Sequence, residues 1–304
     1  MEDSTTVDEE GADGGREHAE HEGGSSVPMT VRSSLGLLLV AIFAGLLWLD
    51  SLWRPGYVLV ALAVPVIALT TCEFCHLTDP KKDYVPRLWT VLAAVALFVL
   101  QWAGWAFEPF PGPWVAAVGV LSLGVCLLFT WRIVSGSIAG TQEAVSLSLT
   151  AWIYVPLLLS FLAGVRVRWG VAGVIVALAV CKISDSTAYF VGKTLGRRKL
   201  APRISPNKTI EGAVGAVIGS TVAAVALNMA SPWALMPLWP AVGYGVALGI
   251  VAIIGDLAGS ILKRQSGVKD SGELLRGFGG MLDIVDDVLF AAPLSYVFFH
   301  FFAG

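Results

Sequence analysis

The chain has 304 residues and a formal net charge of −3, and 56% of its residues are hydrophobic while only 14% are charged. A mean hydropathy of +0.73 excludes an ordinary soluble globular protein. The apolar runs are near the length of a bilayer span and too continuous for the alternating strands of a membrane barrel. Because only helices and closed barrels satisfy their backbone within lipid, the composition predicts an all-α, polytopic membrane protein.

The chain is expected to have two parts. Residues 1–33 are polar, acidic and rich in glycine, which is typical of a disordered tail. Residues 34–304 are expected to form a single integral membrane domain. Its apolar runs predict about nine transmembrane helices, near residues 34–52, 57–77, 88–107, 114–131, 146–164, 171–191, 211–230, 241–262 and 283–303.

The distribution of Lys and Arg predicts the orientation of these spans. With nine spans the two termini lie on opposite sides of the membrane. Most basic residues then fall on the side of the N-terminus, and only Arg54, Arg166 and Arg168 fall on the other. We therefore expect a cytoplasmic N-terminus, a C-terminus outside and a location in the cell (inner) membrane. The loops after the sixth and eighth spans both face the cytoplasm in this topology.

Four carboxylates lie at a similar predicted depth on that cytoplasmic side. Asp185 is near the end of the sixth span, Asp256 is within the eighth, and Asp283 and Asp286 begin the ninth. Ionisable groups at a bilayer boundary are costly, so they are candidates for a functional site. Carboxylates hold a cation while Lys and Arg hold an anion, and the combination predicts a site for metal-bound phosphate.

One face of the eighth span carries much of this charge. Asp256, Ser260, Lys263 and Arg264 are spaced i, i+4, i+7 and i+8. A plain stop-transfer flank would explain the two basic residues. It explains Asp256 poorly, because that residue interrupts the apolar run Val-Ala-Ile-Ile-Gly. In the ninth span, Asp287 can be an ordinary acid of the first helical turn.

A second polar cluster lies between the sixth and seventh spans. Ser205-Pro206 indicates the start of a helix or turn. Lys208 and Thr209 would then lie beside a helix N-terminus, which is a favourable position for phosphate. The segment is not a Walker P-loop, because the glycines before the Lys are missing.

Two other patterns point away from cofactors. Gly212, Gly215 and Gly219 predict a seam of small residues between helices. The run Cys72-Glu73-Phe74-Cys75-His76 matches a c-type haem attachment pattern. We interpret this match as accidental, because haem attachment of this type takes place outside the cytoplasm and the run falls at the cytoplasmic end of the second span.

The two charged clusters together resemble the phosphatidate cytidylyltransferase family, also called CDP-diacylglycerol synthase. The family signature runs Ser-x-x-Lys-Arg, four residues, Lys-Asp, a short spacer and His-Gly-Gly-x-x-Asp-Arg-x-Asp. The matching residues here are Ser260, Lys263, Arg264, Lys269, Asp270, Gly279, Gly280, Asp283 and Asp286. The upstream pattern Asp-x-x-Ala-Tyr, then Ser-Pro-x-Lys-Thr-x-Glu-Gly, is matched by Asp185, Ala188, Tyr189, Ser205, Pro206, Lys208, Thr209, Glu211 and Gly212. The likeness is close over about residues 171–295, the expected catalytic part, and departs at Phe278 (His in the family) and Ile284 (Arg).

The resemblance implies the reaction of CTP with phosphatidate, giving CDP-diacylglycerol and pyrophosphate. A phosphate monoester is already ionised, so positioning and electrostatics are what the protein must supply. We expect Mg²⁺, with a second cation left open, on Asp256, Asp283 and Asp286. The expected catalytic residues are Lys208, Lys263, Arg264, Lys269, Asp270 and Asp185. The expected substrate-binding residues are Ser205, Thr209, Ser260, Gly279 and Gly280. CTP, phosphatidate and membrane lipid are the expected partners, nucleic acid is not, and a homodimer is left open.

Three alternatives stay open at this point. A CTP-dependent lipid kinase for polyprenol or phytol would use a related site. A transporter would use the acids as an ion path, although it predicts internal repeats and acids near mid-membrane. An inactive paralogue would account for Phe278 and Ile284.

Overall fold

The structure is a computed structural model of the chain. It describes residues 42, 45–53, 55–81, 84–108, 110, 112–230, 235–268, 270–272 and 279–303. The chain divides into residues 1–42 and residues 43–304, and the fold below is that of the second unit. The expected tail at residues 1–33 lies outside the described residues, as do Lys269 and Phe278.

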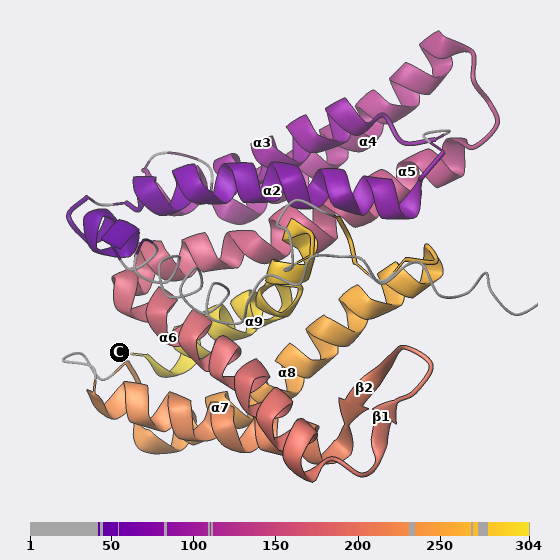
Figure 1. Cartoon of the computed structure of the whole chain (residues 1–304). Helices are drawn as coiled ribbons and strands as arrows, with labels where there is room; N and C mark the ends of the chain where they lie inside the picture. The colour runs from indigo at the N-terminus through magenta and orange to yellow at the C-terminus, as the bar shows by residue number, and fades with distance from the viewer. Residues whose placement is uncertain are drawn as a thin grey trace, which may run out of the picture. The chain divides into compact units, whose positions relative to one another are not determined.

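The described part of the chain is mostly helical, which agrees with the predicted class (Figure 1). Residues 45–51 are helical. The helices that follow are α2 (Tyr57–Thr78), α3 (Arg87–Ala106), α4 (Pro113–Ser135), α5 (Thr141–Trp152), the π-helix η1 (Ile153–Leu157), α6 (Leu158–Leu195), α7 (Ile210–Ala230), α8 (Leu238–Gln265) and α9 (Met281–Phe302). Among the described residues, six helical segments are long and apolar enough to cross a membrane, with Thr141–Leu195 counted as one and α9 not included. The count of nine spans and their orientation stay predictions.

The long segment Thr141–Leu195 is broken where the sequence predicted a loop between two spans. Gly170 has φ 71° and ψ −164°, a backbone conformation that side-chain-bearing residues rarely adopt. The chain changes direction there, and the second limb of α6 continues to the β-hairpin (Figure 1). A Cβ added at Gly173 would lie 2.9 Å from Val165, so the two limbs pack closely beside the break.

Glycines bring α6, α7 and α8 together almost backbone to backbone. A Cβ at Gly212, Gly215 or Gly219 of α7 would collide with α6, which confirms the predicted seam of small residues. On the other side of α7, a Cβ at Gly245 of α8 would lie 2.4 Å from the Cα of Thr221. The three helices that carry most of the site are therefore held at a short, fixed spacing.

This seam predicts that Gly245→Val destabilises the fold. Overpacking against backbone typically costs about 1–3 kcal/mol, and here the obstructing atom is a Cα that cannot rotate away. The measurement is thermal unfolding of the purified protein in detergent. Gly119→Val is the matched control, because Gly119 is a helical glycine in α4 with nothing within 4 Å of the added Cβ. Equal Tm values for the two variants would contradict the tight seam.

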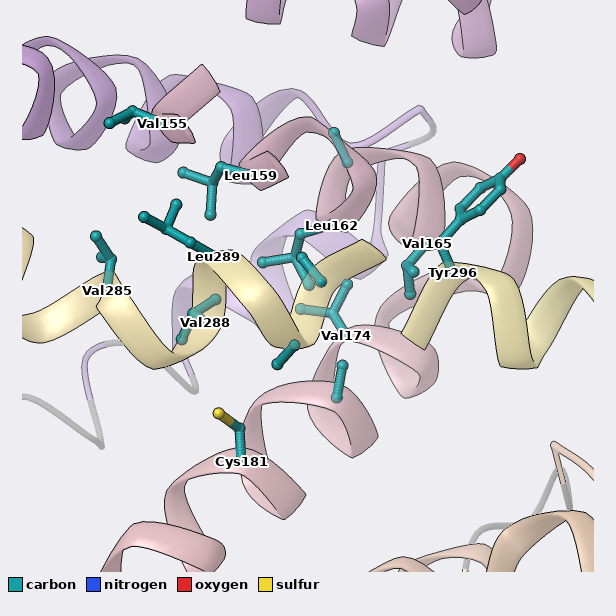
Figure 2. Packing of buried hydrophobic residues seen from close by; sticks show 14 of the residues in the cluster. Val155, Leu159, Leu162, Val165, Val174, Cys181, Val285, Val288, Leu289 and Tyr296 are labelled. Carbon is teal, nitrogen blue, oxygen red and sulfur yellow. The ribbon is translucent and has the colours of Figure 1, made fainter. Parts of the chain in front are cut away.

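Helix α9 lies in the interior against both limbs of α6. Figure 2 shows side chains of α9 among those of η1 and α6 in one buried hydrophobic cluster. The labelled members are Val155, Leu159, Leu162, Val165, Val174, Cys181, Val285, Val288, Leu289 and Tyr296. Asp286 and Asp287 stand on the same helix and are also buried. The packing of α9 therefore carries two carboxylates into the protein interior.

A short antiparallel hairpin connects α6 to α7. Strand β1 (Lys199–Ala201) pairs with strand β2 (Ser205–Thr209), with Lys199 opposite Thr209 and Ala201 opposite Ser205. The prediction that Ser205-Pro206 begins a helix or turn is wrong, because these residues open β2 and α7 begins at Ile210. Proline is tolerated in this strand because a two-stranded hairpin leaves one edge of each strand unpaired.

Candidate active site

A polar pocket of about 500 Å³ lies between α6, the hairpin, α7 and α8. It brings together five of the predicted site residues: Asp185, Ser205, Lys208, Thr209 and Asp256. Its remaining lining includes Tyr189 and Lys193 from α6. The two charged clusters, separated in sequence, therefore meet in space.

An ion pair crosses this pocket. The Nζ of Lys208, on β2, lies 2.5 Å from Oδ2 of Asp256, on α8. The side chains are 23% and 37% exposed, so both stay accessible to a ligand in the pocket. Such an accessible pair can exchange partners, with the ammonium turning to a phosphate and the carboxylate to a cation.

Further carboxylates lie near this pair on α6 and α9. Asp185 of α6 and Asp256 of α8 line the same pocket. Asp286 of α9 packs against α8 one turn after Asp256, since a Cβ added at Gly259 would lie 2.6 Å from Asp286 Oδ2. Asp286 is buried, and its Oδ1 accepts the backbone N–H of Asp287 at 2.8 Å. The structure thus brings Asp185 and Asp256 into one pocket and places Asp286 against the helix that carries Asp256.

Asp283 belongs to a separate set of contacts at the start of α9. Its Oδ1 pairs with the Nζ of Lys263 at 2.5 Å. Its Oδ2 accepts the backbone N–H and the hydroxyl of Ser271 at 2.9 and 3.0 Å, and the N–H of Gly280 at 3.0 Å. The last contact is the reach-back of a capping box. Gly279 has φ 83°, and a Cβ there would lie 2.6 Å from Asp283 Oδ2, so a glycine is required at this turn.

These contacts bear on how a metal would be held. Among the described residues, no three His, Cys, Asp or Glu side chains are grouped closely enough to form a metal cluster. Mg²⁺ is commonly bound by one or two carboxylates, with substrate phosphates and water completing its shell. Asp256 and Asp286 fit that donor set, since neither is fully used by protein donors, whereas both oxygens of Asp283 already accept hydrogen bonds.

Several other predicted site residues have structural partners. The Thr209 hydroxyl accepts the N–H of Gly212 at 3.1 Å and so caps the start of α7. The Nε of Arg264 donates to the carbonyl of Ile204 in the hairpin turn at 3.2 Å, which ties the end of α8 to the hairpin. Ser260 is buried on α8 and Asp270 is exposed. Lys269 lies outside the described residues.

The sequence reasoning missed Lys182. Its Nζ donates to both oxygens of Asp287 at 2.8 Å and to the carbonyl of Ile284 at 3.0 Å. The interpretation of Asp287 as an ordinary first-turn acid is therefore wrong, because it is 2% exposed and ion-paired to another helix. The signal was available: a Lys within an apolar membrane run requires a partner.

Glu73 was also missed, although it lies within the run that matched a haem pattern. It is on α2, and its carboxylate accepts hydrogen bonds from the first turn of α9. Cys72 and Cys75, on either side, are free cysteines. Glu73 lies within the predicted span 57–77, so the signal that marks Lys182 marks it too, but the local sequence does not identify its partners about two hundred residues away.

Comparison with known proteins places the chain in a family. Residues 30–302 match the cytidylyltransferase family. The chain is 31% identical over 258 residues to the phosphatidate cytidylyltransferase of Staphylococcus aureus (strain COL), covering 84% of this chain and 95% of that protein. It is 35% identical over 274 residues to the phosphatidate cytidylyltransferase of Brucella abortus biovar 1 (strain 9-941), covering 88% and 93%. It is 37% identical over 186 residues to the Escherichia coli (strain K12) protein YnbB, covering 59% of this chain and 61% of that protein. On the extent of these matches, the chain belongs to the cytidylyltransferase family.

Proposed function

We propose that this chain transfers a cytidylyl group from CTP to phosphatidate, giving CDP-diacylglycerol and pyrophosphate. The observation that carries the proposal is the accessible Lys208–Asp256 pair in a pocket that is also lined by Asp185 of α6. Relatives named phosphatidate cytidylyltransferase, similar over most of the chain, support the choice of substrates.

The reaction needs no nucleophile from the protein. An oxygen of the phosphatidate phosphate attacks the α-phosphorus of CTP, and a new P–O bond forms. The bond between that phosphorus and the oxygen bridging to the β-phosphate breaks, and pyrophosphate leaves with the bonding electrons. The protein must therefore hold two anions together and neutralise the charge of the leaving group.

Residues in the pocket and next to it would perform different parts of this task. Lys208 and Lys193 supply positive charge to the phosphates. Asp256 and Asp286 would hold Mg²⁺, which supplies charge neutralisation at the phosphoryl oxygens when bound. Asp185 of α6 lines the same pocket and would act as a further ligand or orient a lysine. Asp283 pairs with Lys263 at the turn that begins α9. Asp283 would become a third ligand if Mg²⁺ replaced its present hydrogen-bond donors.

An apolar groove beside the pocket suits a lipid substrate. The groove has a volume of about 510 Å³ and lies over α7 and α8. Its lining is Leu200, Ile210, Ala213, Val214, Val217, Ile218, Ile250, Ile253, Ile254 and Leu257. Leu200, Ala213 and Ile253 also line the charged pocket. A molecule with a phosphate in the pocket can thus lay an acyl chain along the groove.

The proposed topology brings both substrates to this place. With the N-terminus cytoplasmic, the hairpin and the ends of α6 and α8 face the cytosol, where CTP is found. The groove then opens to the cytoplasmic leaflet of the cell (inner) membrane, where phosphatidate is found.

The proposal predicts that Lys208→Ala lowers kcat/KM for CTP or phosphatidate. The loss of transition-state stabilisation should be about 1–3 kcal/mol, the scale of a charge-assisted hydrogen bond. The assay is CTP-dependent formation of CDP-diacylglycerol by purified protein in vesicles containing phosphatidate. Lys199→Ala is the matched control, because Lys199 is exposed on β1 of the same hairpin and does not line the pocket. If kcat/KM in the Lys208 variant equalled that of the control for both substrates, Lys208 would contribute only to membrane orientation, as a positive charge on the cytoplasmic side.

A further inference from the structure

The beginning of α9 is held by a carboxylate from another part of the chain. Glu73 Oε1 accepts the backbone N–H of Met281 at 2.8 Å, and Oε2 accepts that of Leu282 at 2.8 Å. The first N–H groups of a helix have no partner within the helix, and its N-terminal dipole favours a negative charge. Glu73 therefore fixes both the position and the orientation of the first turn of α9.

A hydroxyl connects this cap to the charged end of α8. The Ser271 hydroxyl lies 3.0 Å from Glu73 Oε2 and 3.0 Å from Asp283 Oδ2. Asp283 in turn pairs with Lys263 at 2.5 Å. The contacts run in sequence from α2, through Ser271 and α9, to α8.

The surrounding glycines fit this arrangement closely. A Cβ added at Gly280 would lie 2.5 Å from Glu73 Oε2 and 2.2 Å from the Ser271 hydroxyl. A Cβ added at Gly272 would lie 3.0 Å from Glu73 Oε1. The backbone on both sides of the carboxylate thus leaves room for Glu73 and for little else.

We propose that Glu73 is a positioning residue for the acids of α9, acting through the first turn of that helix. Asp286 lies one turn after Asp283, so a shift or rotation of the first turn moves both carboxylates relative to Asp256 on α8. The inference rests on the proposed function, and it extends the working site to α2, outside residues 171–295. Residues that hold metal ligands in place without binding the metal themselves typically change metal affinity or activity by about 10–100-fold when they are altered.

The test compares Glu73→Gln with Glu143→Gln, a glutamate exposed in the first turn of α5. In Glu73→Gln we expect kcat to fall by about tenfold or more, and the Mg²⁺ concentration for half-maximal rate to rise several-fold. The KM for CTP should change little, because the Lys208 pocket is untouched. Glu73→Asp, which keeps the charge, should recover part of the rate.

A purely structural role predicts a different pattern, in which Tm falls while kinetics per folded molecule and Mg²⁺ dependence stay normal. That pattern would overturn the inference. Ser271→Ala supplies a second check. If the two residues act as one unit, the double variant Glu73→Gln/Ser271→Ala should lose less than the product of the two single effects, and independent effects would contradict the connection.

Hydrogen–deuterium exchange gives a readout that does not depend on activity. The peptide spanning Gly279 to Asp286 should exchange faster in Glu73→Gln than in Glu143→Gln, while peptides of α4 stay unchanged. Unaltered exchange in that peptide would overturn the cap whether or not the protein is active. Absence of product from the natural sequence would instead refute the proposed function.

Discussion

Asp256→Asn is expected to lower turnover by on the order of 10²–10³-fold, the scale of removing one electrostatic contact to a developing charge. The substitution keeps the shape of the side chain and removes its charge. It also takes the counter-ion from Lys208, whose Nζ is 2.5 Å away, and removes one of the two carboxylates that line the pocket. The helix should stay in place, because its packing against α7 is made by glycines and not by this carboxylate.

The measurement is kcat with CTP and phosphatidate across a range of Mg²⁺ concentrations. Glu108→Gln, an exposed carboxylate after α3, serves as the control and should behave as the natural sequence does. Near-normal turnover of Asp256→Asn at ordinary Mg²⁺ concentrations would remove Asp256 from the site.

Asp50→Ala is expected to destabilise the protein by about 3–5 kcal/mol, the typical cost of leaving one member of a buried ion pair alone. The Arg166 Nε lies 2.5 Å from Asp50 Oδ2, and the two side chains are 4% and 0% exposed. Asp50 Oδ1 also accepts the N–H groups of Val58 and Leu59 in the first turn of α2, at 2.9 and 3.2 Å. The variant therefore loses a helix cap as well as a counter-ion.

Thermal unfolding in detergent measures this effect, and the double variant Asp50→Ala/Arg166→Met is the informative comparison. Removing both charges leaves no unpaired ion, so the double variant should be more stable than Asp50→Ala alone. If the single variant unfolds at the same temperature as the natural sequence, the pair contributes nothing to the fold.

The sequence was sufficient for features that depend on local composition. From residue 57 onward, apolar runs predicted the helices within a few residues, and Gly170 lies between two predicted spans. Residues 34–41 of the first predicted span lie outside the described residues. Asp185 and Asp256 were identifiable because a carboxylate inside an apolar run is costly unless it has a function. The predicted membrane topology placed both residues near the same membrane surface, so their meeting in one pocket could be expected.

Features that depend on distant partners could not be predicted in this way. That Asp283 binds a metal stays a prediction, but its hydrogen bonds with Ser271, Gly280 and Lys263 and the capping of the same turn by Glu73 could not be predicted. Nothing in the local pattern distinguishes a capping carboxylate from a ligand. Likewise, Ser205 was expected at a helix or turn start, but pairing with β1 extends it into a strand.

One of the two departures from the family pattern, Ile284, lies within the described residues. Ile284 stands where the resemblance gives Arg, and the Nζ of Lys182 donates to its carbonyl and to Asp287. A cation from α6 thus lies beside the turn of α9 that lacks the Arg.

The central claim is nucleotide transfer to a lipid phosphate, and one labelling experiment tests it most directly. Purified protein in phosphatidate-containing vesicles with Mg²⁺ is given CTP labelled at either the α- or the γ-phosphate. We predict that the α-label enters the lipid, while the γ-label leaves in pyrophosphate. Transfer of the γ-label to a lipid would indicate a kinase, and absence of label from the lipid with both nucleotides would indicate an inactive protein; either result would contradict the account.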